Sequence, residues 1–96
     1  YTTGFFQYIV DFNPGFAIRD LTSNGEYDVF VSKLDANGNF VWAKSMGGAG
    51  VDRGNLVALD ASGNVYTIGY FRGVADFDPE VGVYNLTSSG NTDIFV

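Results

Sequence analysis

Two pairs of oxygen-bearing side chains recur in the chain and are its best candidates for metal chemistry. Asp11 and Asn13 form the first pair, and Asp76 and Asp78 form the second, 65 residues later and again just before a proline. Residues two apart share one face of a strand, and calcium accepts carboxylate and amide oxygens. The same side chains can also cap a proline turn through Asx hydrogen bonds. The sequence leaves both interpretations open: a calcium site, or capped turns without a cofactor.

Two other aspartates open motifs that superficially resemble calcium loops. They begin the stretches Asp35-Ala36-Asn37-Gly38-Asn39 and Asp60-Ala61-Ser62-Gly63-Asn64. A calcium loop of the helix–loop–helix type needs glycine at its sixth position and glutamate at its twelfth, whereas glycine is fourth in both motifs and no glutamate stands at the twelfth position. An aspartate cap with a glycine at positive φ is the chemistry of a tight hairpin turn. We therefore predict β-hairpins over residues 34–40 and 59–65.

The chain lacks the side chains that most often carry catalysis. It contains no histidine and no cysteine, so the commonest general base and the thiol nucleophile are both missing. The glycines at 48, 50 and 54 do not match the dinucleotide-binding spacing, and we interpret Asp52 and Arg53 as a solvated pair or a loop clamp. The prediction is that the chain is not an enzyme. The alternative is that it forms only the wall of a larger enzyme acting on carbohydrate or ester substrates.

Charge and aromatic content limit the expected partners. The net charge at pH 7 is −6, and the five basic residues are scattered along the chain. Binding to nucleic acids needs clustered Lys and Arg, so no nucleic acid is an expected partner. No apolar run is long enough to span a bilayer, and we expect no membrane insertion. Trp42 and the other aromatic residues suit stacking on a carbohydrate, although at strand spacing they are more typical of a core between sheets.

The residue pattern predicts an all-β fold. Glycine, Asn, Asp and Ser separate short runs of Val, Ile, Tyr and Phe, which is typical of strands and turns. We predict main strands over residues 1–6, 27–34, 40–46, 56–60, 65–71 and 93–96. Small connector hairpins are predicted to pair residues 9–12 with 16–21 and residues 74–77 with 81–86, and residues 47–54 form a flexible passage between sheets. Residues 56–59 are apolar on both faces, which predicts a sheet packed between two others.

The chain repeats itself. Residues 1–31 align with residues 66–96 without a gap, and 14 of these 31 positions are identical. A fixed period of 65 residues indicates a repeat architecture in which each unit buries its faces against its neighbours. The chain holds about one and a half units, and we expect it to be a piece of a longer protein.

Four motifs carry a resemblance to a known family. They are Val-Phe-Val-Ser-Lys-Leu-Asp-Ala-Asn-Gly-Asn-Phe-Val-Trp-Ala-Lys at 29–44, Gly-Gly-Ala-Gly-Val-Asp-Arg-Gly-Asn at 47–55, Ala-Leu-Asp-Ala-Ser-Gly-Asn-Val-Tyr-Thr-Ile-Gly at 58–69 and Asp-Ile-Phe-Val at 93–96. With them the chain resembles the SBBP-type β-propeller repeat of secreted bacterial proteins, in the form found in Bacteroidetes-like bacteria. The resemblance implies antiparallel β-sheet repeats: about one and a half blades of roughly four strands plus a connector hairpin.

In this reading residues 1–46 are a partial first blade with strands two to four, and residues 47–96 are a partial second blade with strands one to three. The expected function is that of a non-catalytic structural and binding module of a secreted, extracellular or cell-surface protein. Open sheet edges pair with other strands, so we expect self-association, or completion by blades of the parent chain. The alternatives are a filament-forming extracellular subunit and the wall of a propeller enzyme.

Overall fold

The structure, a computed structural model, describes all 96 residues. They form ten short strands joined by turns and loops, and no helix. The strands are β1 (Thr2–Phe6), β2 (Ile9–Asp11), β3 (Asp20–Thr22), β4 (Asp28–Leu34), β5 (Phe40–Gly48), β6 (Arg53–Leu59), β7 (Val65–Phe71), β8 (Val74–Asp76), β9 (Asn85–Thr87) and β10 (Asp93–Phe95). The predicted all-β fold is therefore confirmed. None of its segments is a helix long and apolar enough to cross a membrane.

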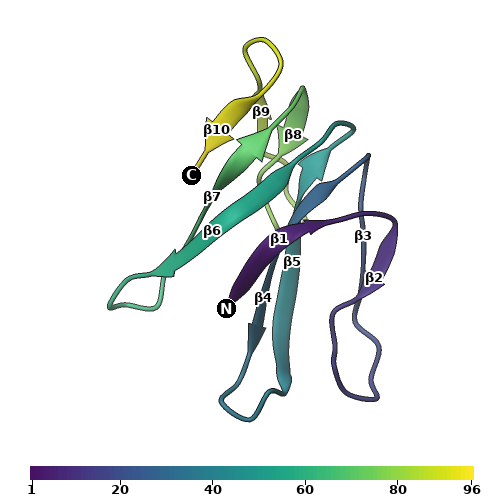
Figure 1. The fold of residues 1–96 in the computed structure, drawn as a ribbon, viewed down its shortest axis with the longest axis vertical. Helices are drawn as coiled ribbons and strands as arrows, with labels where there is room; N and C mark the ends of the chain where they lie inside the picture. The colour runs from purple at the N-terminus through teal and green to yellow at the C-terminus, as the bar shows by residue number, and fades with distance from the viewer.

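Ten strands form three antiparallel sheets. The first sheet has the order β1-β4-β5-β8-β9, the second has the order β10-β7-β6, and β2 pairs only with β3. In Figure 1 the β2–β3 hairpin and the β6–β7 pair lie on opposite sides of β4 and β5. We call residues 1–46 the first half of the chain and residues 47–96 the second half. The connector hairpin β8–β9 of the second half extends the sheet of the first half, and β1 and β10 are edge strands.

The 65-residue repeat is reproduced in the strand register. In the β1–β4 pair Phe6 lies opposite Asp28, and in the β7–β10 pair Phe71 lies opposite Asp93. Each residue of the second pair is 65 positions after its counterpart in the first. A register slip of one residue would move every side chain to the other face of the sheet, so the two halves present matching faces.

The two predicted hairpin turns are confirmed, and an aspartate caps each of them. The amides of Asn37 and Asn39 donate to Asp35 Oδ1 over 2.8 and 2.9 Å, and Gly38 has a φ of 83°. The turn that begins at Asp60 repeats this arrangement, with Gly63 at a φ of 82°. Glycine is required there because L-residues with a side chain are strained at such φ values.

The connector hairpins are present, but their second strands begin later than predicted. Strands β3 and β9 start at Asp20 and Asn85, rather than at residues 16 and 81. The reason is that the carboxylate at the end of the first strand binds the far side of the loop. Asp11 Oδ1 accepts a hydrogen bond from the Arg19 amide over 2.9 Å. Asp76 Oδ1 accepts one from the Tyr84 amide in the second loop at the same distance.

The Gly-rich passage is shorter and more ordered than predicted. Strand β5 continues to Gly48, because Gly47 and Gly48 pair with Asp76 and Ala75 of β8. A Cβ on Gly48 would collide with the Val74 carbonyl oxygen. Glycine is therefore needed here for the close approach of two backbones.

The main core lies between the first and second sheets. Its buried members are Val29, Phe71, Ala75 and Phe95, and Met46 and Phe77 pack against them. Only 12 of the 96 residues are buried, so this small cluster provides much of the apolar contact between the two halves. The expectation that β6 is buried on both faces is wrong, because Leu56 and Leu59 are about half exposed and no further sheet covers them.

Replacing Phe71 with alanine should lower the free energy of unfolding by about 3–5 kcal/mol, because the large side chain leaves a cavity in the core. The matched control is Phe16→Ala, since Phe16 is fully exposed and its removal should change stability by less than about 0.5 kcal/mol. Urea denaturation of both variants measures the difference. Equal effects at the two positions would show that the core lies elsewhere.

Candidate functional site

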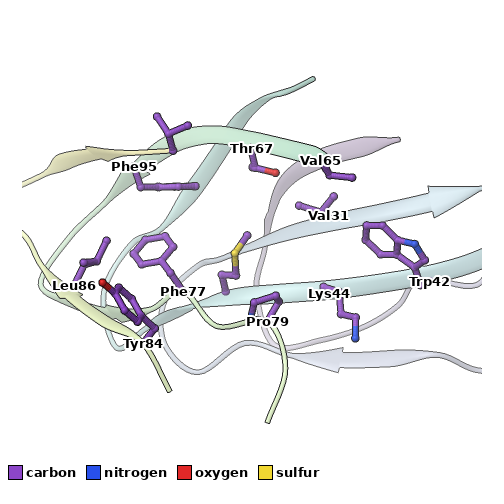
Figure 2. A pocket seen from close by; sticks show the side chains of 12 residues that line it. Val31, Trp42, Lys44, Val65, Thr67, Phe77, Pro79, Tyr84, Leu86 and Phe95 are labelled. Carbon is purple, nitrogen blue, oxygen red and sulfur yellow. The ribbon is translucent and has the colours of Figure 1, made fainter. Parts of the chain in front are cut away.

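An apolar hollow lies between the first and second sheets. Its volume is about 370 Å³, and nine of its twelve lining residues are hydrophobic. Figure 2 shows its lining side chains converging from β4, β5 and the β8–β9 hairpin on one side and from β7 and β10 on the other. The residues that define its ends are Trp42 and Leu86. The hollow thus continues the interface that contains the buried core.

Polar and aromatic groups surround one end of this hollow. Lys44 Nζ lies 2.7 Å from Glu80 Oε1, and both side chains are substantially exposed, so the pair adds only about 0–1 kcal/mol. The Trp42 ring packs edge-on against Tyr1 with 6.0 Å between ring centroids, and Lys33 Nζ lies 5.2 Å from the Tyr1 ring centroid. The half-buried Trp42, predicted either to stack on a sugar or to join a core, lines the hollow and packs on a second aromatic ring.

Two fully buried carboxylates form the most unusual polar site of the molecule. Asp28 and Asp52 both have 0% exposure. They meet beside Gly47, where an added Cβ would lie 2.7 Å from Asp28 Oδ1 and 2.9 Å from Asp52 Oδ2. Any residue other than glycine would therefore collide with both carboxylates.

Backbone amides bind three of the four carboxylate oxygens at this site. The Asn24 amide donates to Asp28 Oδ2 over 3.0 Å. The Gly48 amide donates to Asp52 Oδ2 over 2.8 Å, and the Arg72 amide donates to Asp52 Oδ1 over 3.3 Å. Asp28 Oδ1 is buried and accepts no hydrogen bond. The pair therefore joins the end of β5 to the segments before β4 and after β7.

Burial changes the protonation of both acids. Burial raises the pKa of Asp28 to about 6; the Asn24 hydrogen bond opposes this rise, and the nearby charge of Asp52 adds to it. Burial also raises the pKa of Asp52, against the hydrogen bonds from Gly48 and Arg72. A protonated Asp28 carries less charge into the interior, which lowers the cost of its burial.

Asp52 and Arg53 do not form a pair with each other. Asp52 is a buried clamp between backbone segments, which confirms the loop-clamp interpretation. The Arg53 guanidinium instead lies over two aromatic rings, 4.4 Å from the Phe5 centroid and 5.3 Å from the Tyr27 centroid. A cation stacked on aromatic faces contributes about 0.5–2 kcal/mol, so Arg53 fixes β6 against the first sheet.

The residues of the predicted calcium pairs take part in Asx turns. Asp11 Oδ1 accepts the Asn13 amide, and Asn13 Oδ1 accepts the Gly15 amide. Asp76 and Asp78 repeat this pattern in the second half. The hydrogen bonds from the Arg19 and Asn13 amides hold the pKa of Asp11 below its usual value, and those from the Tyr84 and Asp78 amides do the same for Asp76.

No group of three or more acidic side chains gathers at either pair. The capping role is therefore visible in the structure, and calcium binding stays a prediction.

Sequence reasoning did not single out Asp28 as a site residue. The available signal was its recurrence as Asp93, at the same place before an apolar strand. A charged residue retained next to a buried strand suggests a structural partner. The partner, Asp52, lies 24 positions away along the chain, and only the fold brings the two together.

The chain is similar to an uncharacterized WD repeat-containing protein of Acanthamoeba polyphaga mimivirus. The two are 30% identical over 76 residues, which make up 79% of this chain and 5% of the viral protein. The chain thus spans a small part of that relative's length. No protein-family model and no solved structure matches the chain. WD repeats build the four-stranded blades of β-propellers, and the antiparallel all-β fold fits a fragment of such blades.

The chain should become more stable as the pH falls from 7.5 to 5. The native state keeps a proton on Asp28 up to about pH 6, whereas the unfolded chain loses it near pH 3.8. The stabilisation by this proton is therefore complete below pH 3.8 and is lost as the pH rises through 6, a difference of about 1 kcal/mol. Below pH 4 the stability should fall again, because Asp11, Asp35, Asp60 and Asp76 have lowered pKa values.

Urea denaturation at pH 5 and pH 7.5 measures this difference. Asp28→Asn should remove most of the gain, since an amide does not titrate. The exposed turn variant Asp35→Asn is the control and should retain the gain. A wild-type chain that is equally stable at both pH values would show that Asp28 is ionised in the folded state.

Proposed function

We propose that the chain is a non-catalytic structural and binding repeat module that assembles through its open strands and faces. The observation that carries this proposal is the repeated register of β1–β4 and β7–β10, together with the position of β1 and β10 as edge strands. The backbone groups along an unpaired edge are a template for strands of another chain or of further blades. The similarity to a WD repeat-containing protein supports a repeat module, because propellers of such repeats present surfaces to partners.

The chemistry of the buried acids supports a non-catalytic role. A catalytic carboxylate has to reach a substrate in a cleft. Asp28 and Asp52 are instead closed off from solvent, and backbone amides occupy three of their four oxygens. Their role is to join segments of the repeat.

The setting that we propose is a secreted or cell-surface bacterial protein of the SBBP type. The motifs at 47–55 and 58–69 support it. In the structure these motifs build the buried clamp around Asp52 and the capped turn at Asp60. Carbohydrate is a second partner class within this proposal, because Trp42 also lines a second hollow together with Lys44 and Glu80.

Sedimentation velocity over a range of roughly 5–500 µM, typical for weak interfaces, tests the assembly. We expect the average mass to rise above the 10.4 kDa of one chain with increasing concentration. The rise should persist in 0.5 M salt, since apolar contacts are not screened as charges are. The control is Val81→Lys, because Val81 is fully exposed and lies outside every strand. A single species of one-chain mass throughout would reject the assembly.

Calcium at the pairs Asp11/Asn13 and Asp76/Asp78 is part of the proposal as a stabilising ion. Millimolar calcium should then raise the melting temperature of the wild-type chain, since a ligand that binds only the folded state stabilises it. Asp78→Asn should reduce this rise, and Asp35→Asn should leave it unchanged. If the wild-type melting temperature does not change, calcium is rejected and capping is the only role of these side chains.

A further inference from the structure

The contact between the two halves of the chain joins two different faces. We call Val29, Val31 and Met46 the front face of the first half; Val29 and Met46 lie opposite each other in the β4–β5 pair. The other side of the contact is the back face of the second half, made by Phe71, Phe77 and Phe95. Because a front face meets a back face, this contact is heterologous, and the same contact can be repeated from one unit to the next.

The first half carries a back face of its own. Its residues are Phe6, Phe12 and Phe30, each 65 positions before its counterpart in the second half. The Phe6 and Phe12 ring centroids lie 5.4 Å apart, and those of Phe12 and Phe30 lie 4.8 Å apart. The corresponding distances in the second half are 5.1 and 4.7 Å. The arrangement of the rings in this back face matches that of the occupied one; Phe6 is buried, and Phe12 and Phe30 are half-buried.

The second half carries a front face of its own, and that face is bare. Ile94 stands at the position of Val29 in the repeat and pairs with Tyr70 as Val29 pairs with Phe5. Val29 is 0% exposed, whereas Ile94 is 78% exposed. Leu56 and Ile68, which lie opposite each other in the β6–β7 pair, are also exposed. The difference has two causes: the second half packs on Val29 and β5 pairs beside it, whereas β10 is an edge strand and no part of the chain covers Ile94.

We propose that the Ile94 face of one copy docks on the Phe12 face of a second copy, repeating the apolar part of the contact that exists inside each chain without its β5–β8 strand pairing. This inference rests on the assembly proposed above and names the surfaces that it uses. The centre of the contact follows from the repeat: Val29 packs in one cluster with Ala75, and the counterparts of these residues are Ile94 and Val10. Val10 is half-buried and lies on β2, which pairs only with β3.

Head-to-tail docking makes a specific prediction for two blocked variants. Ile94→Asp loses its front contact and keeps its back face, and Val10→Asp loses its back contact and keeps its front face. Each variant alone should sediment as a single chain, because a buried unpaired carboxylate opposes association. An equimolar mixture should form a species of twice the 10.4 kDa chain mass and nothing larger. The dimer has no free complementary pair of faces, so it cannot grow.

Cysteine cross-linking tests the same contact with milder changes. The chain has no cysteine of its own, so a disulfide in a mixture of Ile94→Cys and Val10→Cys reports only on the introduced positions. A heterodimer should form rapidly under mild oxidation, since the two Cβ atoms must come within about 4.5 Å. A mixture of Val81→Cys and Val10→Cys is the control and should form at least tenfold less heterodimer. Circular dichroism checks that each variant is folded.

The possible failures are distinguishable. If the wild-type chain associates but the blocked variants do not form a dimer, the assigned faces are wrong and the assembly uses other surfaces. The assignment also fails if Val81→Cys cross-links as readily as Ile94→Cys. A wild-type chain that remains single at all concentrations overturns both the assembly and its assigned faces.

Discussion

The packing of Val29 against Phe71 and Phe95 is the interaction on which the rest of the structure depends. It joins two sheets that share no strand-to-strand pairing between β4 and β7. Short strands with one open edge are marginal on their own, and few residues of this chain are buried. Apolar contact between the halves therefore has to compensate the loss of chain entropy. The hollow beside this core continues the same interface, so the site and the stability of the fold have one origin.

The buried acids act as a second, polar constraint on the same junction. Asp52 accepts amides from Gly48 and Arg72, so one side chain fixes the end of β5 relative to the end of β7. Gly47 has no side chain and so leaves the space in which Asp28 approaches Asp52. Backbone groups withdrawn from water must be paired, and here the carboxylates provide the acceptors that irregular segments lack. Burying a charged carboxylate costs free energy. The raised pKa of Asp28 lowers this cost, because it keeps the side chain protonated, and so uncharged, up to about pH 6.

The sequence predicted the features that depend on local chemistry. The turns at Asp35 and Asp60 were predictable because an aspartate cap and a glycine at positive φ act within five residues. Side-chain bonds across longer distances were not predictable. Because Asp11 accepts a hydrogen bond from the Arg19 amide, β3 starts later along the chain than predicted. The contact between Asp28 and Asp52 depends on the whole fold. The pairing of β8 with Gly47 and Gly48 likewise extended β5 beyond its predicted end, because no local pattern encodes a neighbouring strand.

The two positions Val29 and Ile94 show why a repeat has to be read together with its surroundings. Both carry a β-branched apolar side chain at the same place in the same strand register, yet one is buried and the other exposed. Local propensity cannot produce this difference, since both residues lie in equivalent strand pairs, β1–β4 and β7–β10; but β4 is also paired with β5, whereas β10 is an edge strand. It arises from this pairing and from whether a back face of Phe side chains lies on top. Ile94 shares its exposed face with Leu56 and Ile68, and a contiguous apolar patch of this kind, unlike a single exposed residue, marks an interaction surface.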